Sequence, residues 1–223
     1  LDPARDCPLC PRLVAYRHEQ RAKHPDWFNA PVPTFGALDE AALLVVGLAP
    51  GVSGANRTGR PFTGDYAGDL LYATLGEYGF AQGTFAARPD DGLTLTGAAV
   101  TNAVRCVPPQ NKPIGAEIKA CRPFLEATVA AMPSATVVLA LGRIAHDAVL
   151  RTFGLTLSKH PFAHGAIHRA GERFVADSYH PSRYNVNTGV LTAQMFNAVV
   201  AGVRQLVDGD LSAADDQPAR LRR

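Results

Sequence analysis

Short apolar runs alternate along the chain with segments whose apolar residues recur at helical spacing. The runs predict strands over residues 41–48, 98–104, 136–141 and 174–176, because strands buried on both faces are almost continuously hydrophobic. The helical patterns predict helices over 8–23, 66–80, 115–132 and 143–153, and from about 188 to 207. Residues 24–35 and 84–97 are predicted to be irregular. This alternation favours an α/β fold, a single-domain three-layer α/β/α sandwich with a mainly parallel central sheet.

The chain of 223 residues is long enough to bury a full core in one domain. We assign residues 1–207 to that domain and residues 208–223 to a polar C-terminal tail, which we expect to be frayed. No apolar run reaches the roughly eighteen residues of a membrane-spanning helix, and the first residues lack the apolar stretch of a signal peptide. We therefore expect a soluble, cytoplasmic, monomeric protein without a membrane partner.

The net charge of +2 is close to neutral, and 19% of the residues are charged, as in an ordinary globular protein. Arginine nevertheless far outnumbers lysine. Because the guanidinium group suits two-point contacts with phosphate, the composition allows a local basic face.

The first predicted strand leads directly into a glycine-rich loop at residues 47–65, GLAPGVSGANRTGRPFTGD. Glycines let a backbone approach a ligand closely, and ligands of open α/β sheets bind at the carboxyl ends of the strands. Loops 101–111 and 177–185 leave the same ends of other strands, so we expect all three loops to converge. The dinucleotide and P-loop phosphate motifs are absent. Taken alone, the glycines could equally serve only to make turns.

The side chains on these loops fit a flat, polar ring. Asn102 can donate and accept hydrogen bonds at once, and Phe62 can stack on a ring, which together favour a nucleobase over a sugar or a peptide. No nucleophile with a partner base, paired glutamates or HExxH helix is present. Asn102 could instead cap a turn, and His180 could be a structural surface residue. The prediction rests on the set, which comprises Phe62, Asp65, Asn102, His180, Ser182 and Asn185.

Four cysteines form a second candidate site. Cys7 and Cys10 make a CxxC pair, whereas fourteen residues separate Cys106 from Cys121. In a cytosolic chain, grouped cysteines are more often metal ligands than disulfides, although buried free thiols and a chance CxxC pair are the alternative. Four thiolates could hold tetrahedral zinc or a [4Fe–4S] cluster. The wide second spacing favours the cluster, because zinc ribbons usually show two tight pairs.

Both motifs and the cysteine set resemble the uracil-DNA glycosylase superfamily, most closely its family 5, the B-type iron–sulfur enzymes. The residues that carry the resemblance are the 47–65 loop, HPSRYN at 180–185 and the four cysteines. It implies a monofunctional DNA repair hydrolase that flips uracil, and other deaminated or 5-substituted bases, out of DNA. Hydrolysis of the N-glycosidic bond then leaves an abasic site. The resemblance also implies a [4Fe–4S] cluster on Cys7, Cys10, Cys106 and Cys121.

The resemblance further assigns roles within the motifs. It implies Asp65, His180 and Asn102 as catalytic residues, and Ser182, Arg183 and Tyr184 as DNA contacts; the implied substrate-binding residues are Gly47, Ala49, Gly51, Phe62 and Asn185. In several sister families a polar residue precedes the proline of the first motif and handles the attacking water. Here Ala49 stands at that position, a departure typical of family 5. Family members often carry glutamines where Arg183 and Tyr184 stand, which leaves the residue that wedges into the duplex open.

Two other readings belong to different classes. One is a non-catalytic nucleic-acid-binding module stapled by zinc, which would be colourless and would not cleave at uracil. The other is a sister-family glycosylase that acts on uracil alone. Ala49 in place of the polar residue, together with Asp65 in its expected alternate position, argues against both readings.

Overall fold

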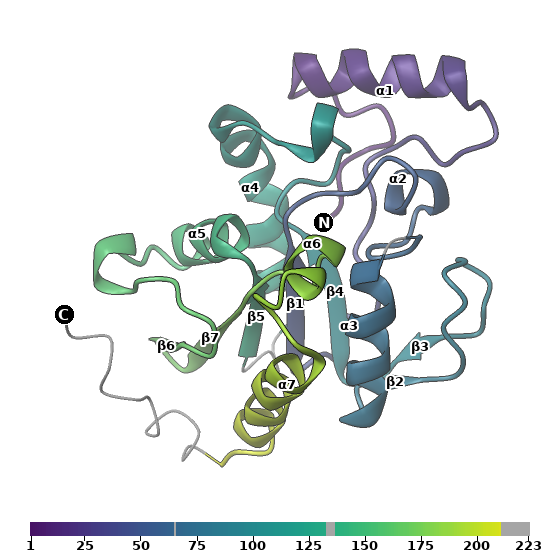
Figure 1. The fold of residues 1–223 in the computed structure, drawn as a ribbon. Helices are drawn as coiled ribbons and strands as arrows, with labels where there is room; N and C mark the ends of the chain where they lie inside the picture. Colours follow the sequence, from purple (N-terminus) through teal and green to yellow (C-terminus); the bar gives the residue numbers. More distant parts are fainter. Residues whose placement is uncertain (65, 133–136, 211–223) are drawn as a thin grey trace.

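A five-stranded sheet with the order β4-β1-β5-β7-β6 forms the centre of the computed structural model, which describes residues 1–64, 66–132 and 137–210 (Figure 1). Its strands are β1 (Leu43–Gly47), β4 (Ala98–Asn102), β5 (Val137–Leu141), β6 (Ile167–Ala170) and β7 (Arg173–Ser178). All neighbours pair in parallel except β6, which is antiparallel to β7. The predicted, mainly parallel α/β architecture is therefore confirmed.

Helices cover both faces of this sheet. On one face lie α3 (Tyr66–Glu77) and α7 (Ala193–Val207), and on the other lie α4 (Gly115–Ala130) and α5 (Arg143–Thr152). Successive residues of a strand point to opposite faces. Accordingly, Leu43 and Val45 join the first core, and Leu44 and Val46 join the second. Burying each such side chain contributes roughly 1.5–3 kcal/mol, so these strands are anchored from both sides.

The remaining elements lie around the layers. They are α1 (Pro11–Lys23), α2 (Ala55–Thr58), the hairpin of β2 (Ala81–Gln82) and β3 (Thr94–Leu95), α6 (Arg183–Asn187), and the 3-10 turns Pro109–Asn111 and Leu157–Lys159. Figure 1 shows α1 and α2 beyond the end of the sheet. Helix α1 packs through Leu13 against Val104 and Cys121, which form a small separate core.

Several expectations differ from the structure, beginning with the first helix, which starts at Pro11 rather than at residue 8. Strand β6 was not predicted, because its sequence IHRA is short and contains no apolar run. The region 84–97 is not wholly irregular, since β3 lies within it. The last helix begins at Ala193 rather than near residue 188, because Thr192 caps it there by accepting a hydrogen bond from the Met195 amide at 3.1 Å.

Parts of some predictions lie outside the described residues, namely Asp65, the first residue of the strand predicted over 136–141, and most of the predicted tail, residues 211–223. Helix α7 ends at Val207, where the domain was expected to end. None of the helices in the described ranges has the length and apolar character needed to cross a bilayer.

Candidate active site

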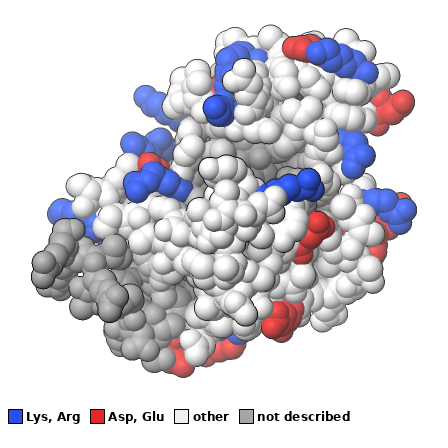
Figure 2. Space-filling model, in the orientation of Figure 1, with Lys and Arg blue, Asp and Glu red and all other residues white. Residues whose placement is uncertain are grey.

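The loops that follow β1, β4 and β7 meet at one edge of the sheet around a cavity of about 280 Å³. The residues that line it are Leu48, Ala49, Pro50, Gly51, Ala55, Phe62, Asn102, Asn111, His180 and Ser182. Its volume approaches the lower end of the 300–1,000 Å³ typical of small-molecule sites. Figure 2 shows a hollow in the middle of this face, above α6, with Lys and Arg side chains on several sides of it. The three predicted loops therefore do converge.

Gly47 allows the two central side chains of the cavity to pack closely. It pairs with Asn102 in the register of β1 and β4. A Cβ atom at position 47 would lie 2.4 Å from Cζ of Phe62 and 2.5 Å from Oδ1 of Asn102. Any larger residue would push the ring and the amide away. Gly47 thus acts beneath the cavity rather than in its lining.

The ring of Phe62 forms one wall. It is 7% exposed, and its centroid lies 6.0 Å from that of His180 with 26° between the ring planes. The backbone of Phe62 is left-handed, with φ of 55°. Such a conformation costs a non-glycine residue on the order of 1–3 kcal/mol and persists only where neighbouring structure enforces it. The orientation of this aromatic face is therefore specified by its surroundings.

His180 follows β7 and offers an uncharged imidazole to the cavity. Burial lowers the pKa of His180 to about 4, so its ring is neutral near pH 7. Within the described residues, neither ring nitrogen takes part in a hydrogen bond. The main chain of His180 is held by a hydrogen bond, because the Asn185 side-chain amide donates to the His180 carbonyl at 2.8 Å. The ring nitrogens are thus free to contact a ligand.

The other residues of the HPSRYN segment divide between scaffold and surface. Ser182 lines the cavity and caps α6 by accepting a hydrogen bond from the Asn185 amide at 3.3 Å. Asn185, which we expected to bind substrate, is not among the lining residues and holds His180 instead. Arg183 and Tyr184 point outward, and Tyr184 is 74% exposed. They lie where a macromolecule bound over the cavity would meet them.

Two features were missed in the sequence, one in the cavity and one outside its lining. Asn111 lines the cavity, and it and Gln110 are consecutive non-glycine residues in the left-handed region, with φ of 56° and 57°. Asp177 is fully buried at the end of β7 and lies between two histidines, with its carboxylate oxygens 2.8 Å from His146 Nδ1 and 3.0 Å from His168 Nε2. No local pattern marks either feature, because each depends on residues distant in the chain.

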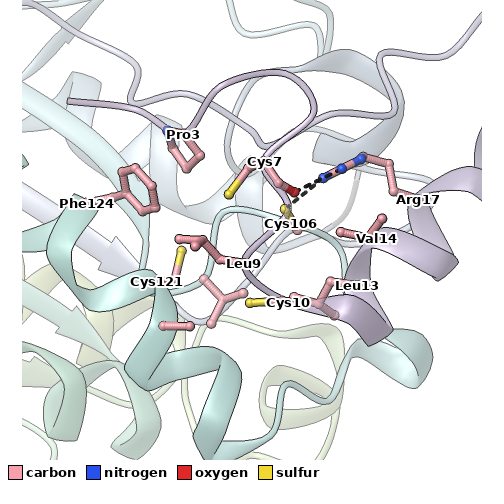
Figure 3. Close-up of a pocket in the computed structure, with 12 residues that line it drawn as sticks. Pro3, Cys7, Leu9, Cys10, Leu13, Val14, Arg17, Cys106, Cys121 and Phe124 are labelled. Atoms are coloured by element: carbon pink, nitrogen blue, oxygen red, sulfur yellow. Dashed lines mark hydrogen bonds between the residues drawn. The ribbon is translucent and has the colours of Figure 1, made fainter.

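The four cysteines line a second, largely apolar cavity (Figure 3). They come from the N-terminal loop and the residue before α1, the segment after β4, and α4. Two groups donate to their sulfur atoms: the Arg17 guanidinium, 3.7 Å from Cys106, and the Arg105 backbone amide, 3.3 Å from Cys121. Burial, together with the charge of neighbouring thiolates, raises the pKa of Cys10 to about 11. Burial likewise raises the pKa of Cys106 to about 12, against the opposing charge of Arg17.

A compact group of possible metal ligands lies elsewhere in the fold. Across the described parts of the chain, one group of three possible ligands is spaced closely enough to hold a metal ion. It comprises His146, His168 and Asp177, whose ligand atoms lie within 4.8 Å of one another. Those atoms already bond to each other.

The fold and the cavity together define an α/β protein with a small-molecule-sized site at its sheet edge, and comparison with known proteins gives the family. The model of the uracil DNA glycosylase superfamily matches residues 33–204. The chain belongs to this superfamily.

The chain is more similar to type-5 than to type-4 proteins among the relatives compared. The type-5 uracil-DNA glycosylase of Thermus thermophilus is 47% identical over 90% of this chain and 93% of its own length. That of Pyrobaculum aerophilum is 39% identical over 87% of this chain and 86% of its own length. A type-4 uracil-DNA glycosylase of P. aerophilum is 31% identical over 70% of this chain and 65% of its own length. The predicted resemblance to family 5 is confirmed.

Proposed function

We propose that the cavity at the sheet edge receives a uracil flipped out of DNA and that the protein hydrolyses its N-glycosidic bond, leaving an abasic site. The observation that carries this proposal is the meeting of Phe62, Asn102 and His180 around one cavity in a chain of this superfamily. A base inside a duplex is unreachable, so an enzyme that acts on it must extrude it into such a pocket.

Stabilising the leaving base is the task we assign to Asn102 and His180. Breaking the bond places negative charge on the pyrimidine and positive charge on the sugar. Preorganised donors aimed at the developing anion lower the barrier most effectively in a site that excludes water. Asn102 is 4% exposed at the end of β4, and neutral His180 can donate one ring N–H. Phe62 offers a face on which the base stacks.

The attacking water is the task we assign to Asp65. This aspartate closes the 47–65 loop and precedes α3 directly in the sequence. Its carboxylate would orient or deprotonate water and face the cationic sugar. No second carboxylate is required of the kind that most O-glycosidases use, because a hydrogen-bonded pyrimidine anion is a tolerable leaving group. Ser182, Arg183 and Tyr184 would contact the DNA around the extruded base.

We further propose that the four cysteines hold a [4Fe–4S] cluster in a monomeric enzyme. An all-sulfur donor set, an apolar lining and N–H donors to Cys106 and Cys121 suit such a cluster. When bound, the cluster would supply structural cross-linking, since the groups assigned to the reaction need no electrons. It would tie the segment before α1 to α4.

The catalytic assignments predict large losses in two variants. Asp65→Asn keeps the shape but removes the charge, and His180→Ala removes a donor. Each should lower the single-turnover rate of uracil release by about 10²–10³. Affinity for DNA containing an abasic-site analogue should stay near that of the wild type, because neither residue is assigned to the backbone. A wild-type rate in either variant would show that the residue does not perform the assigned role.

Substrate range is expected to be broad, because Gly51 leaves one side of the cavity open. A bulky side chain at position 51, which lines the cavity, would narrow that side of it. A hydrophobic wall discriminates one carbon by only about 1–3 kcal/mol, so uracil should remain the best or nearly the best substrate. Gly51→Tyr should therefore reduce release of 5-hydroxymethyluracil more than release of uracil, measured on matched oligonucleotides. Equal losses would show that position 51 does not face C5.

A further inference from the structure

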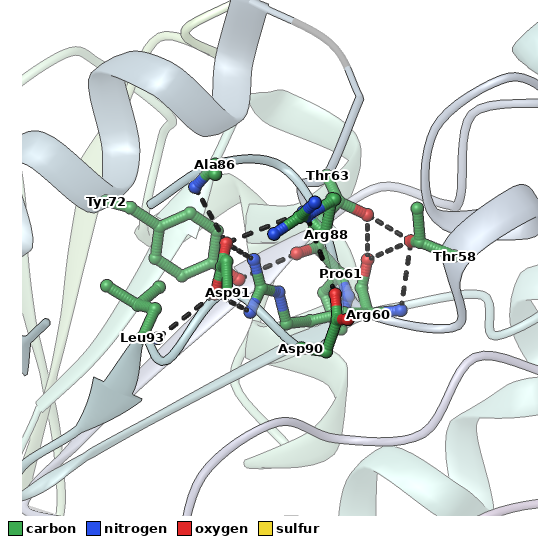
Figure 4. A network of polar contacts seen from close by, with 10 residues as sticks. All are labelled: Thr58, Arg60, Pro61, Thr63, Tyr72, Ala86, Arg88, Asp90, Asp91 and Leu93. Atoms are coloured by element: carbon green, nitrogen blue, oxygen red, sulfur yellow. Dashed lines mark hydrogen bonds and ion pairs between the residues drawn. The ribbon is translucent and has the colours of Figure 1, made fainter. Parts of the chain in front are cut away.

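Arg60 lies two residues before Phe62 in the glycine-rich loop and forms a buried ion pair with Asp91. Its Nη1 and Nη2 atoms donate to the two carboxylate oxygens of Asp91 at 2.8 and 2.7 Å (Figure 4). The two side chains are 5% and 0% exposed. Removing two charges from water is costly unless the geometry is excellent and further hydrogen bonds satisfy the pair. This pair therefore requires additional partners.

Asp91 has those partners in its own loop. Its carboxylate also accepts the backbone amides of Ala86 and Leu93, at 2.8 and 3.0 Å. The Arg60 guanidinium, aided by these amides, holds the pKa of Asp91 well below its usual range. The carboxylate thus organises the loop between β2 and β3 and fastens it to the cavity loop.

Aromatic rings enclose the guanidinium on its other sides. The Arg60 Cζ atom lies 5.2 Å from the centroid of Phe35, 5.7 Å from that of Tyr72 and 5.5 Å from that of Phe85. Each distance is within the reach of a cation–π contact. Ion pair and rings together leave the side chain of Arg60 a single well-defined position.

Hydrogen bonds to the main chain fix the residues that connect Arg60 to Phe62. The Thr63 hydroxyl donates to the Arg60 carbonyl at 2.7 Å, and the Tyr72 hydroxyl donates to the Pro61 carbonyl at 2.7 Å. Gly68 lets the turn lie on α3, because a Cβ atom there would be 1.9 Å from the Phe62 carbonyl oxygen. These contacts surround the left-handed residue Phe62 on both sides in sequence.

We propose that Arg60 and Asp91 are positioning residues that set the Phe62 ring against the base, acting through Phe62 rather than on the substrate. Neither residue is among those that line the cavity. The inference rests on the stacking role given to Phe62 in the proposed function. It extends the site to a loop that lies 26 residues beyond Asp65 in the sequence, where no motif of the family resemblance stands.

A double-mutant cycle tests this inference. Asp91→Asn and Phe62→Ala are made singly and together, and single-turnover uracil release is measured at saturating, iron-loaded protein well below its melting temperature. Asp91→Asn should lower the rate about 10- to 100-fold, since a misplacement of about 1 Å can cost that much. In the Phe62→Ala background it should add less than roughly a twofold loss, because coupled residues are not additive. Affinity for abasic-site DNA should not change.

Two further variants keep the test decisive. Arg60→Lys retains the charge but loses the two-point contact, so it should lower the rate as Asp91→Asn does. It replaces Asp91→Asn in the cycle if that variant folds poorly. Thr74→Val is the control, because buried Thr74 donates to Asn197 of α7 at 2.9 Å and should change stability without changing the rate. Equal losses from Asp91→Asn with and without Phe62 would overturn the positioning role alone. A wild-type rate for Phe62→Ala would overturn the stacking role and the inference with it.

Discussion

Two supports of different chemistry hold the walls of the cavity. The ion-pair support, Arg60 with Asp91, lies behind Phe62. The cysteine support, formed by Cys7, Cys10, Cys106 and Cys121, lies behind Ala49, which lines the cavity and packs on the small core of Leu13, Val104 and Cys121. Asn111 belongs to the same side, since it follows Cys106 by five residues.

The two supports differ in whether the polypeptide completes them. Asp91 has its counter-charge and its amide donors within the chain. Burial is the main cause that raises the pKa values of Cys10, Cys106 and Cys121, so these three thiols are protonated near pH 7. A metal centre bound there would displace their protons. Helix α1 buries only Leu13, Arg17 and Gln20. The first support therefore belongs to the protein alone, whereas the second would be completed by the proposed cofactor.

The largest effect is expected from breaking the cysteine support. Cys121→Ser should abolish binding of iron and release the N-terminal segment, because structural metal sites contribute on the order of 10 kcal/mol to folding. Iron content, absorption near 400 nm and limited proteolysis of residues 1–30 measure this. The matched control is Val14→Ala, which trims the lining of the same cavity but leaves all four thiols. Full iron occupancy in Cys121→Ser, or stoichiometric zinc in the wild type, would contradict the cofactor assignment.

Breaking the ion-pair support should cost less and should leave the iron in place. Asp91→Asn leaves the buried charge of Arg60 without its counter-charge. Breaking a buried ion pair in this way typically lowers the free energy of unfolding by about 3–5 kcal/mol. Because the pKa of Asp91 is depressed in the folded protein, this stability is present above the unfolded value of about 4 and is lost only as the pH falls below it. Denaturant unfolding between pH 3 and 8 checks both points. A difference that persisted unchanged at the lowest pH would argue against a charge effect.

Features that depend on residues close together in the chain could be predicted from the sequence. Buried strands show as apolar runs, and the glycine-rich loop and HPSRYN segment stand at strand ends, so the sheet edge and its cavity could be predicted. The partners of Arg60 could not, because Asp91 is 31 residues away in a loop without a pattern. Asn111 escaped for a similar reason, since its place at the cavity depends on how the segment after Cys106 turns.

The smallest expected effect concerns His180, which belongs to neither support. Burial lowers the pKa of His180 in the folded protein to about 4, below the unfolded value of about 6.5. The unfolded chain therefore binds the extra proton first, and stability should fall as the pH drops from about 6.5 to 4. The kcat/KM for uracil release should likewise decline only as the pH approaches 4, if the neutral ring is the donor. His180→Asn should remove this part of the pH dependence of unfolding, and an unchanged profile would contradict the assignment.

Excision of uracil by the iron-loaded protein tests the central claim most directly. A duplex oligonucleotide with one uracil opposite guanine is incubated with the protein, treated with alkali and compared with duplexes that carry thymine or 5-hydroxymethyluracil at the same position. The account predicts strand scission at uracil, scission at 5-hydroxymethyluracil and protection of thymine, from a brown protein. Intact strands at uracil, from protein that carries its cluster and binds the duplex, would contradict it.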